Sequence, residues 1–148
     1  MNLMVAAILA GALAWGPAFA HDVDETAAFG EPGKAARVTR TIDIEAGEMY
    51  FTPDRLEVKL GETIKFVIVD RGRKSHEFVL GDLAFQQAHA REMAAMPGMD
   101  MAEPNEAALD PGQTRTVIWH FTKPGDFIFA CAYPGHAEAG MEGEIFVK

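Results

Sequence analysis

The C-terminal stretch "DFIFACAYPGHAEAGMEGEIFVK", residues 126–148, joins two strand-like segments through a loop rich in metal-binding side chains. The segments "DFIFACA" and "GEIFVK" have the aromatic and β-branched residues typical of strands. Between them, Cys131 is the only cysteine of the chain, and His136 and Met141 follow at intervals of five residues around the Pro134-Gly135 turn. The pattern predicts a thiol, an imidazole and a thioether brought together at one end of a β-sheet.

Short segments of period two also occupy the rest of the chain. They are "RVTRTIDIEA", "RLEVKL", "TIKFVIVD", "SHEFVL" and "QTRTVIWHF". Turn signals lie between them at Thr52-Pro53-Asp54, Asp70-Arg71-Gly72, Asp110-Pro111-Gly112 and Lys123-Pro124-Gly125. About seven strands without βαβ alternation predict an all-β fold, an antiparallel β-sandwich.

One segment departs from this period. From Asp82, "DLAFQQAHAREMAAM" is built from good helix formers and stops at Pro97-Gly98, so we expect one short helix before the late strands. The spacing i, i+4, i+8 and i+11 places four side chains on one face of this helix. They are Phe85, His89, Met93 and Met96.

The first 20 residues, "MNLMVAAILAGALAWGPAFA", are uncharged and end in the small-x-small pattern Ala18-Phe19-Ala20. A membrane-spanning helix is the alternative, but the Ala- and Gly-rich composition makes a poor anchor. No Lys or Arg precedes the apolar run, as a signal peptide would normally have. We expect residues 1–20 to be a signal peptide, 21–36 a polar flexible leader and 37–148 a single domain in the periplasm.

The formal net charge of −9 over 148 residues disfavours nucleic acid and anionic membranes, and suits a basic partner or simple solubility. We expect a monomer with no membrane contact after cleavage. One cysteine cannot form an internal disulfide, so in an oxidising compartment it is either buried or held by a metal.

A thiolate with imidazoles and a weak thioether suits copper that cycles between Cu(I) and Cu(II). Zinc tolerates Cys and His, but Met is a poor zinc ligand. Taken singly, a buried Cys, a buried Met and a surface His are usually ordinary packing or surface residues. Their joint spacing around a turn between two strands favours the copper site.

The same stretch resembles the C-terminal signature of the cupredoxins, the plastocyanin/azurin superfamily of type 1 copper proteins, with a loop of rusticyanin-like length. Two further segments, "SHEFVLGDLAFQQAHAREMAAMPGMDMAEPN" and "PGQTRTVIWHFTKPGDF", resemble the periplasmic copper-tolerance (CopI-like) cupredoxins. The resemblance covers roughly residues 38–148. It implies a Greek-key β-sandwich and one type 1 copper ion bound by His76, Cys131, His136 and Met141.

The first of these ligands rests on the resemblance, because spacing alone does not choose among His21, His76, His89 and His120. A weak local argument agrees, since His76 follows the turn "DRGRKS" at an expected end of the sandwich. Many cupredoxins have Asn or Ser after the first His, whereas this chain has Glu77. An ionised carboxylate cannot donate a hydrogen bond, so the surroundings of the ligands do not carry over.

A second cluster of soft donors consists of His89, Met93, Met96, Met99 and Met101. These side chains either hold Cu(I) weakly or simply cover the edge of the sandwich, and the second interpretation is preferred because Pro97-Gly98 interrupts the helix. Cleavage after Ala20 would also leave His21 with a free amine and imidazole that suit Cu(II).

The predicted function is one-electron transfer by a copper protein that serves copper tolerance, with a cytochrome, oxidase, reductase or copper-handling protein as partner. The alternative is a copper scavenger or carrier. An enzyme is not expected, because the sequence has no second histidine cluster for a catalytic copper. We expect Pro134, Ala137, Ala139 and Met141 to form an apolar docking patch around His136.

Overall fold

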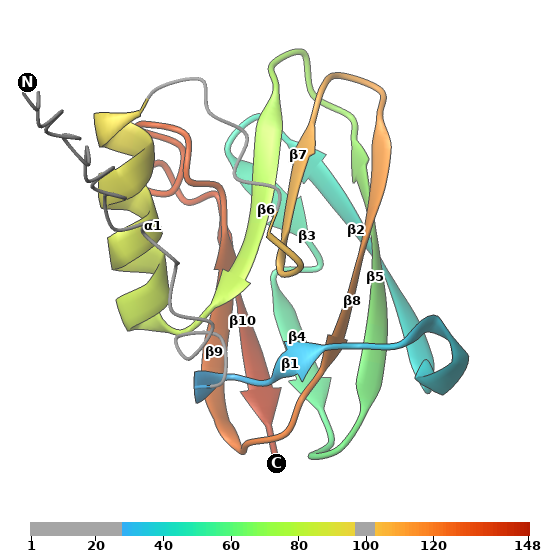
Figure 1. Cartoon of the computed structure of the whole chain (residues 1–148). Coiled ribbons are helices and arrows are strands. Elements are labelled where there is room, and N and C mark those ends of the chain that lie inside the picture. Colours follow the sequence, from blue (N-terminus) through green and yellow to red (C-terminus); the bar gives the residue numbers. More distant parts are fainter. Residues whose placement is uncertain (1–27, 97–102) are drawn as a thin grey trace, which may run out of the picture.

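The computed structural model describes residues 28–96 and 103–148. Two five-stranded sheets face each other (Figure 1). One sheet has the strand order β1 (Glu31–Pro32), β8 (Thr114–His120), β5 (Thr63–Asp70), β2 (Arg40–Gly47) and β3 (Tyr50–Thr52). The other has the order β4 (Arg55–Val58), β10 (Glu142–Val147), β9 (Gly125–Ala130), β6 (His76–Gly81) and β7 (Glu106–Leu109). The predicted all-β sandwich is confirmed, and the Greek-key connections stay a prediction.

Strand pairing is mixed rather than purely antiparallel. The pairs β2–β5 and β4–β10 run parallel, whereas the remaining described pairs are antiparallel. A parallel pair requires a crossover connection, because a tight hairpin reverses the chain direction. Period-two alternation reveals which residues are in a strand but not which strand lies beside it, so these two pairs were not foreseen.

The core between the sheets follows the alternation read from the sequence. Ile64, Phe66 and Ile68 point inward from β5 and are fully buried. Phe78 of β6 and Phe129 of β9 stack in the opposite sheet, with ring centroids 5.2 Å apart. A Cβ at Gly143 would lie 2.2 Å from the Phe129 ring, so glycine on β10 makes room for that ring. Each such aromatic side chain contributes roughly 1.5–3 kcal/mol through burial.

Residues 28–36 belong to the folded domain, and the prediction of a flexible leader is wrong for this part of the segment. Phe29 is fully buried and stacks on Trp119 at 5.2 Å between ring centroids. The indole Nε1–H of Trp119 donates to the Phe29 carbonyl at 3.2 Å, and β1 pairs with the end of β8. Gly30 has φ +138°, and a Cβ there would lie 2.4 Å from the His120 carbonyl oxygen. One aromatic residue within a polar, Gly/Pro-rich stretch therefore fixes this segment, which continues into a short 3-10 helix, η2 (Ala35–Arg37).

The predicted helix is confirmed as α1 (Leu83–Ala95), which begins at the N-cap Asp82. The Asp82 carboxylate accepts a hydrogen bond from the Phe85 amide at 2.8 Å, as expected for an N-cap. His89 and Met93 are buried and Phe85 packs against the core, whereas Met96 is 38% exposed. The inward face therefore ends before the fourth residue predicted for it. No helix among the described residues is long and apolar enough to cross a membrane.

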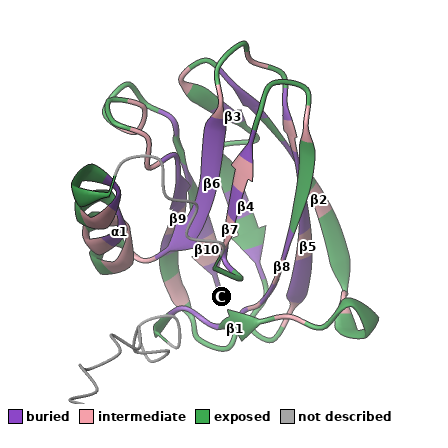
Figure 2. Ribbon diagram, turned by 45° about the horizontal axis from the view of Figure 1, so that its top comes forward, coloured by how far each residue is buried: buried purple, intermediate pink, exposed green. Residues whose placement is uncertain are grey.

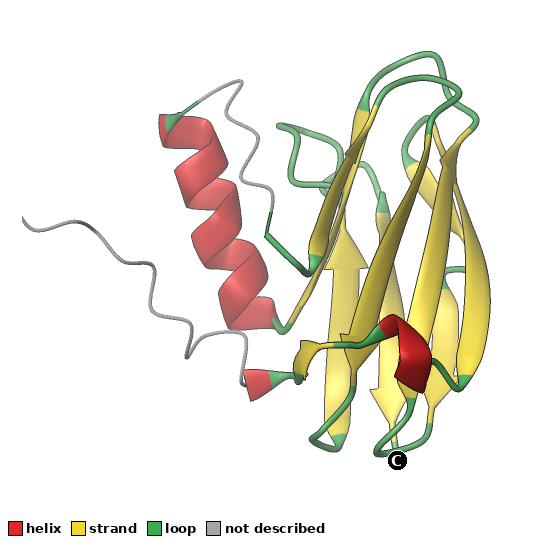
Figure 3. Cartoon of the chain, turned by 45° about the vertical axis from the view of Figure 1, so that its right-hand side comes forward, coloured by secondary structure: helices red, strands yellow, loops and turns green. Residues whose placement is uncertain are grey.

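Helix α1 lies against the outer face of the second sheet, beside β6 and β9 (Figures 1 and 3). The Gln86 side chain links the helix to β6 by donating to the Val79 carbonyl at 2.6 Å. Because the core covers one face of β6 and the helix covers the other, all six residues of β6 are buried (Figure 2). The consequence for function is that polar residues of β6 on both faces lie away from water.

Candidate metal centre

The loop between β9 and β10 is closed by its own backbone hydrogen bonds. The Met141 amide donates to the His136 carbonyl at 3.0 Å, and the Cys131 amide donates to the Met141 carbonyl at 3.1 Å. Gly135 and Gly140 adopt positive φ angles of 83° and 102°, which favour glycine at these two bends. The loop thus returns to its starting point, and Cys131 and Met141 face each other across the strand ends.

Two of the predicted ligands are in direct contact. Sγ of Cys131 lies 3.3 Å from Nδ1 of His136, and the Glu77 amide donates to the same sulfur at 3.4 Å. Burial raises the pKa of the Cys131 thiol to about 11, although the amides near it act in the opposite direction. At neutral pH this thiol stays protonated unless a cation takes the place of the proton.

His76 comes from the other side of the site, at the start of β6, and its imidazole is fully buried. Nδ1 lies 3.1 Å from Oδ2 of Asp70, while Nε2 has no hydrogen-bond partner among the described residues. The ring centroid lies 5.4 Å from that of His136. If Nδ1–H donates to Asp70, Nε2 has a free lone pair, and a carboxylate that orients a histidine in this way is common behind metal ligands.

His136 is the only one of the four predicted ligands that is not fully buried. Burial lowers the pKa of its imidazole first, and the electrostatic influence of the neighbouring His76 and Lys74 side chains acts in the same direction. The neutral form that binds metals is therefore favoured at neutral pH. Tyr133 packs edge-on against the ring, with centroids 5.9 Å apart.

Met141 lies beneath the surface and not in it, so its predicted place in the apolar docking patch is wrong. Its side chain is fully buried in the core, whereas Pro134 and Ala139 are exposed and Ala137 is half-buried. The Met141 side chain belongs to the hydrophobic core cluster, and its carbonyl accepts the Cys131 amide. The patch around His136 therefore consists of the three smaller residues.

These residues together fit copper. Two sulfur side chains are buried at positions whose backbones are hydrogen-bonded to each other, one buried imidazole nitrogen has no partner among the described residues, and a second imidazole contacts the thiol. Two nitrogen and two sulfur donors form the set that copper prefers when it alternates between its two charge states.

Comparison with known proteins agrees with this chemistry. A family model described as copper binding proteins, plastocyanin/azurin family, matches residues 38–148. The chain belongs to this family. It is a cupredoxin, and its cofactor is copper.

Two relatives carry the same descriptive name, copper-resistant cuproprotein CopI. The protein from Rubrivivax gelatinosus is 46% identical over 132 residues, which cover 88% of this chain and 79% of the relative. The protein from Pseudomonas aeruginosa is 36% identical over 150 residues, covering 82% of this chain and 83% of the relative.

Solved cupredoxin structures share the fold. The dithionite-reduced auracyanin of Roseiflexus castenholzii superposes with a TM-score of 0.63 at 26% identity, over 75% of this chain and 98% of the auracyanin. Auracyanin B superposes with a TM-score of 0.65 over 81% of this chain and 96% of the auracyanin, and at 22% identity this match supports the fold alone.

The other predicted donors lie elsewhere. His120 is on β8, half-exposed, with Nδ1 3.0 Å from the Glu31 carboxylate, as expected for an ordinary sheet residue. His89 is a buried residue of α1, and its imidazole lies between the carboxylates of Glu77 and Glu106. His21, Met99 and Met101 fall outside the described residues, as do the predicted signal peptide of residues 1–20 and the first part of the predicted leader.

The role of Asp70 was not predicted from the sequence, because Asp70-Arg71-Gly72 is an ordinary turn signal. Its Oδ1 does accept the Gly72 amide at 2.7 Å, as a turn residue would. The other oxygen, Oδ2, faces His76, and both side chains are fully buried. The hydrophobic strand "TIKFVIVD", which ends in Asp70, is the signal that an acidic side chain enters the interior here.

Proposed function

We propose that this cupredoxin binds one type 1 copper ion through His76, Cys131, His136 and Met141, and that it passes single electrons in the service of copper tolerance. Copper, when bound, supplies the interconversion of Cu(I) and Cu(II). The relatives named copper-resistant cuproproteins support the physiological role.

The observation that carries this proposal is the unequal burial of the four side chains. His76, Cys131 and Met141 are fully inside the protein, whereas the His136 imidazole reaches the surface between exposed Pro134 and Ala139. An electron carrier needs one ligand edge at the surface through which the electron reaches its partner. The rest of the metal site must be shielded from water, because water would reorganise around the ion at each change of charge. His136 provides that edge.

The residues around the ligands hold them before the ion arrives. Asp70 contacts the His76 ring, the Glu77 amide donates to the Cys131 sulfur, and the Met141 amide donates to the His136 carbonyl. A constrained set of donors moves little when copper changes its charge, which favours rapid electron transfer.

The partner we propose is a redox protein that docks on the patch formed by Pro134, Ala137 and Ala139 around His136. The net charge of −9 favours a partner with a basic surface. We place the protein in the periplasm on the strength of the signal-like residues 1–20, and we expect it to act as a monomer.

A copper carrier is the competing function, and copper-resistant relatives are compatible with it. The two functions differ in what leaves the protein. The purified, copper-loaded and reduced protein should pass electrons to a basic c-type cytochrome faster than it loses Cu(I) to a chromogenic chelator. Copper loss that outpaces electron transfer would overturn the proposal in favour of the carrier.

The ligand set and the docking patch have separate tests. Copper loading should produce a strong visible sulfur-to-copper band, and Cys131→Ser should abolish it. Ala139→Lys should slow electron transfer to the basic cytochrome and leave the visible band intact, since it places a positive charge in the patch that repels this partner but removes no ligand. Ala84→Lys is the matched control, because Ala84 is exposed in the first turn of α1, at the end of the helix far from the copper loop (Figure 1).

A further inference from the structure

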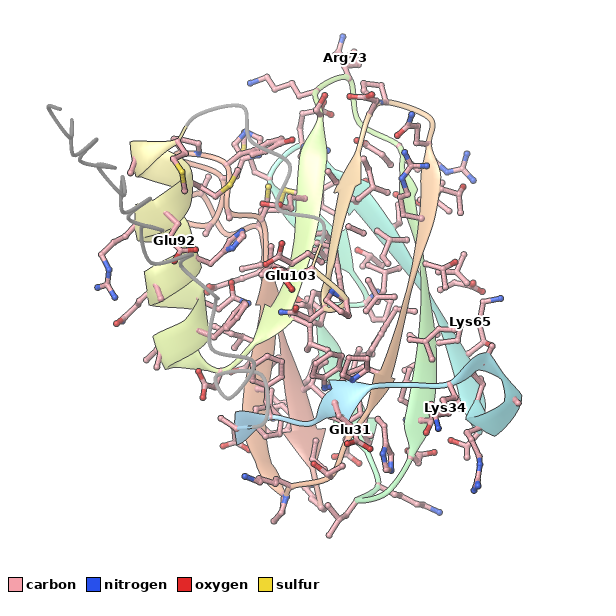
Figure 4. All side chains as sticks on the ribbon, in the orientation of Figure 1. Glu31, Lys34, Lys65, Arg73, Glu92 and Glu103 are labelled. Carbon is pink, nitrogen blue, oxygen red and sulfur yellow. The ribbon has the colours of Figure 1, made fainter. Side chains whose placement is uncertain are left out.

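A second group of metal-binding side chains lies outside the copper centre, between the second sheet and α1. One potential donor atom from each of Glu77, His89 and Glu106 lies within 4.8 Å of the others. Nε2 of His89 is 3.5 Å from Oε2 of Glu77, and its Nδ1 is 3.1 Å from Oε1 of Glu106. Figure 4 shows nitrogen and oxygen atoms gathered between α1 and β6.

These three side chains come from three elements, β6, β7 and α1. Alternation along β6 sends His76 toward the copper centre and Glu77 to the opposite face of the sheet. Glu106, on the neighbouring strand β7, pairs with Val79 of β6. It is therefore the diagonal neighbour of Glu77 on that outer face. His89 reaches down from α1, which covers both carboxylates.

The cluster is buried, and several of its polar atoms receive no hydrogen bond from the described part of the chain. The side chains of His89, Glu77 and Glu106 are only 3–4% exposed. Oε2 of Glu77, Nε2 of His89 and both carboxylate oxygens of Glu106 lack a well-formed hydrogen bond among the described residues. Buried carboxylates without hydrogen bonds are costly, and they are normally compensated by a partner.

We propose that Glu77, His89 and Glu106 form a second metal site, which takes a divalent transition ion such as Zn²⁺ or Cu²⁺. Two carboxylates and one imidazole match the oxygen and nitrogen donors that these ions accept. An imidazole ligand disfavours Ca²⁺ and Mg²⁺, which prefer oxygen donors throughout. A doubly charged cation also balances the two carboxylates when His89 is neutral.

The electrostatics of the cluster agree with this geometry. Burial raises the pKa of Glu106 to about 7, partly opposed by His89. Burial acts to lower the pKa of His89, but the carboxylates of Glu77 and Glu106 outweigh it and raise that pKa. Both groups thus keep their protons to a higher pH than usual when no cation is present, and a metal ion would replace those protons.

This site differs from the Cu(I) cluster considered for His89 and the methionines, since its other donors are carboxylates. Zn²⁺ is therefore the appropriate probe, because thioethers bind it poorly. The protein is first loaded with one equivalent of copper, so that Cys131 is occupied, and is then titrated with Zn²⁺. Elemental analysis and native mass spectrometry report copper and zinc per chain.

We expect one zinc in addition to one copper per chain. Glu106→Gln should weaken zinc binding by at least about tenfold, the lower range for loss of a metal-site contact, while the copper content and visible band stay unchanged. Glu103→Gln is the matched control, because it removes the same charge from an exposed position three residues away and should leave zinc binding intact. His21→Ala should also leave it intact, which excludes the N-terminus.

His89→Gln provides an independent variant from the helix side and should likewise lose zinc. Retention of the copper band in each variant shows that the fold persists. The proposal is overturned if the copper-loaded protein binds no zinc, or if Glu106→Gln and His89→Gln bind zinc as tightly as the unaltered chain.

Discussion

Oδ2 of Asp70 lies 3.1 Å from Nδ1 of His76, and both side chains are completely buried at the end of the sandwich. The other oxygen of the same carboxylate accepts the Gly72 amide. Asp70 thus joins the turn that precedes β6 to the first candidate copper ligand. A ligand held in this way binds metal without first having to be ordered.

Replacement of Asp70 by Asn should weaken copper binding by about 10- to 100-fold, the usual cost of losing a carboxylate behind a metal-bound histidine. The amide has a similar shape but is a poorer acceptor for Nδ1–H. Competition with a copper chelator measures the change. Asp43→Asn, at an exposed position on β2, serves as the control. Equal affinities of the two variants would show that Asp70 does not orient His76.

Cu(I) affinity should rise about tenfold for each pH unit between pH 7 and 9. The pKa of Cys131, raised to about 11 by burial, means that the thiol is protonated throughout this range and must release one proton to the metal. Chelator competition at several pH values, corrected for protonation of the chelator, gives the slope. A flat profile would mean that the thiol is already ionised or does not bind copper.

The Glu106→Gln substitution should change how the stability of the metal-free protein depends on pH. Burial raises the folded-state pKa of Glu106 from 4.5 to about 7, so its stabilising contribution is complete below about pH 4.5 and is lost as pH rises through 7. The variant, which has no such group, should gain about 2 kcal/mol relative to the unaltered protein between pH 5 and 8.

Urea unfolding at the two pH values, with a chelator present, measures this difference. Glu103→Gln should show no comparable change, because that carboxylate is exposed. A constant difference between Glu106→Gln and the unaltered protein at both pH values would contradict the raised pKa.

The segment before β2 should contribute strongly to stability through a single ring. Phe29→Ala should lower the free energy of unfolding by about 3–5 kcal/mol, because it empties the space beside Trp119 and Phe85. Leu83→Ala, at a position 64% exposed, should cost far less. Denaturant unfolding measures both. Similar losses for the two variants would show that Phe29 is not docked in solution as the structure describes.

Local patterns predicted most of the fold. Alternation in "TIKFVIVD" placed Ile64, Phe66 and Ile68 on the inner face, and loss of that alternation after Asp82 located α1. The short strand "EAAL" of β7 has little intrinsic strand preference and exists because β6 lies beside it. Partners distant in sequence, such as the parallel neighbours β2 and β5, leave no local signal.

The candidate copper site divides in the same way. Cys131, His136 and Met141 lie within one loop, so their spacing was sufficient to predict that they converge. His76 lies 55 positions before Cys131, and it was selected over the other histidines by family resemblance, with weak support from the turn before it. The carboxylates of Glu77 and Glu106 meet through strand pairing beneath a helix, and no sequence motif indicates such a contact.

The hydrogen bond from the Cys131 amide to the Met141 carbonyl also closes the segment between β9 and β10 on itself. Its two ends are anchored by neighbouring strands, so residues can be added or removed between them while the sandwich keeps its own contacts. Loop grafting between relatives should then tune redox potential and colour independently of folding. Natural selection has the same freedom, since a new electronic character requires only a new loop on an unchanged scaffold.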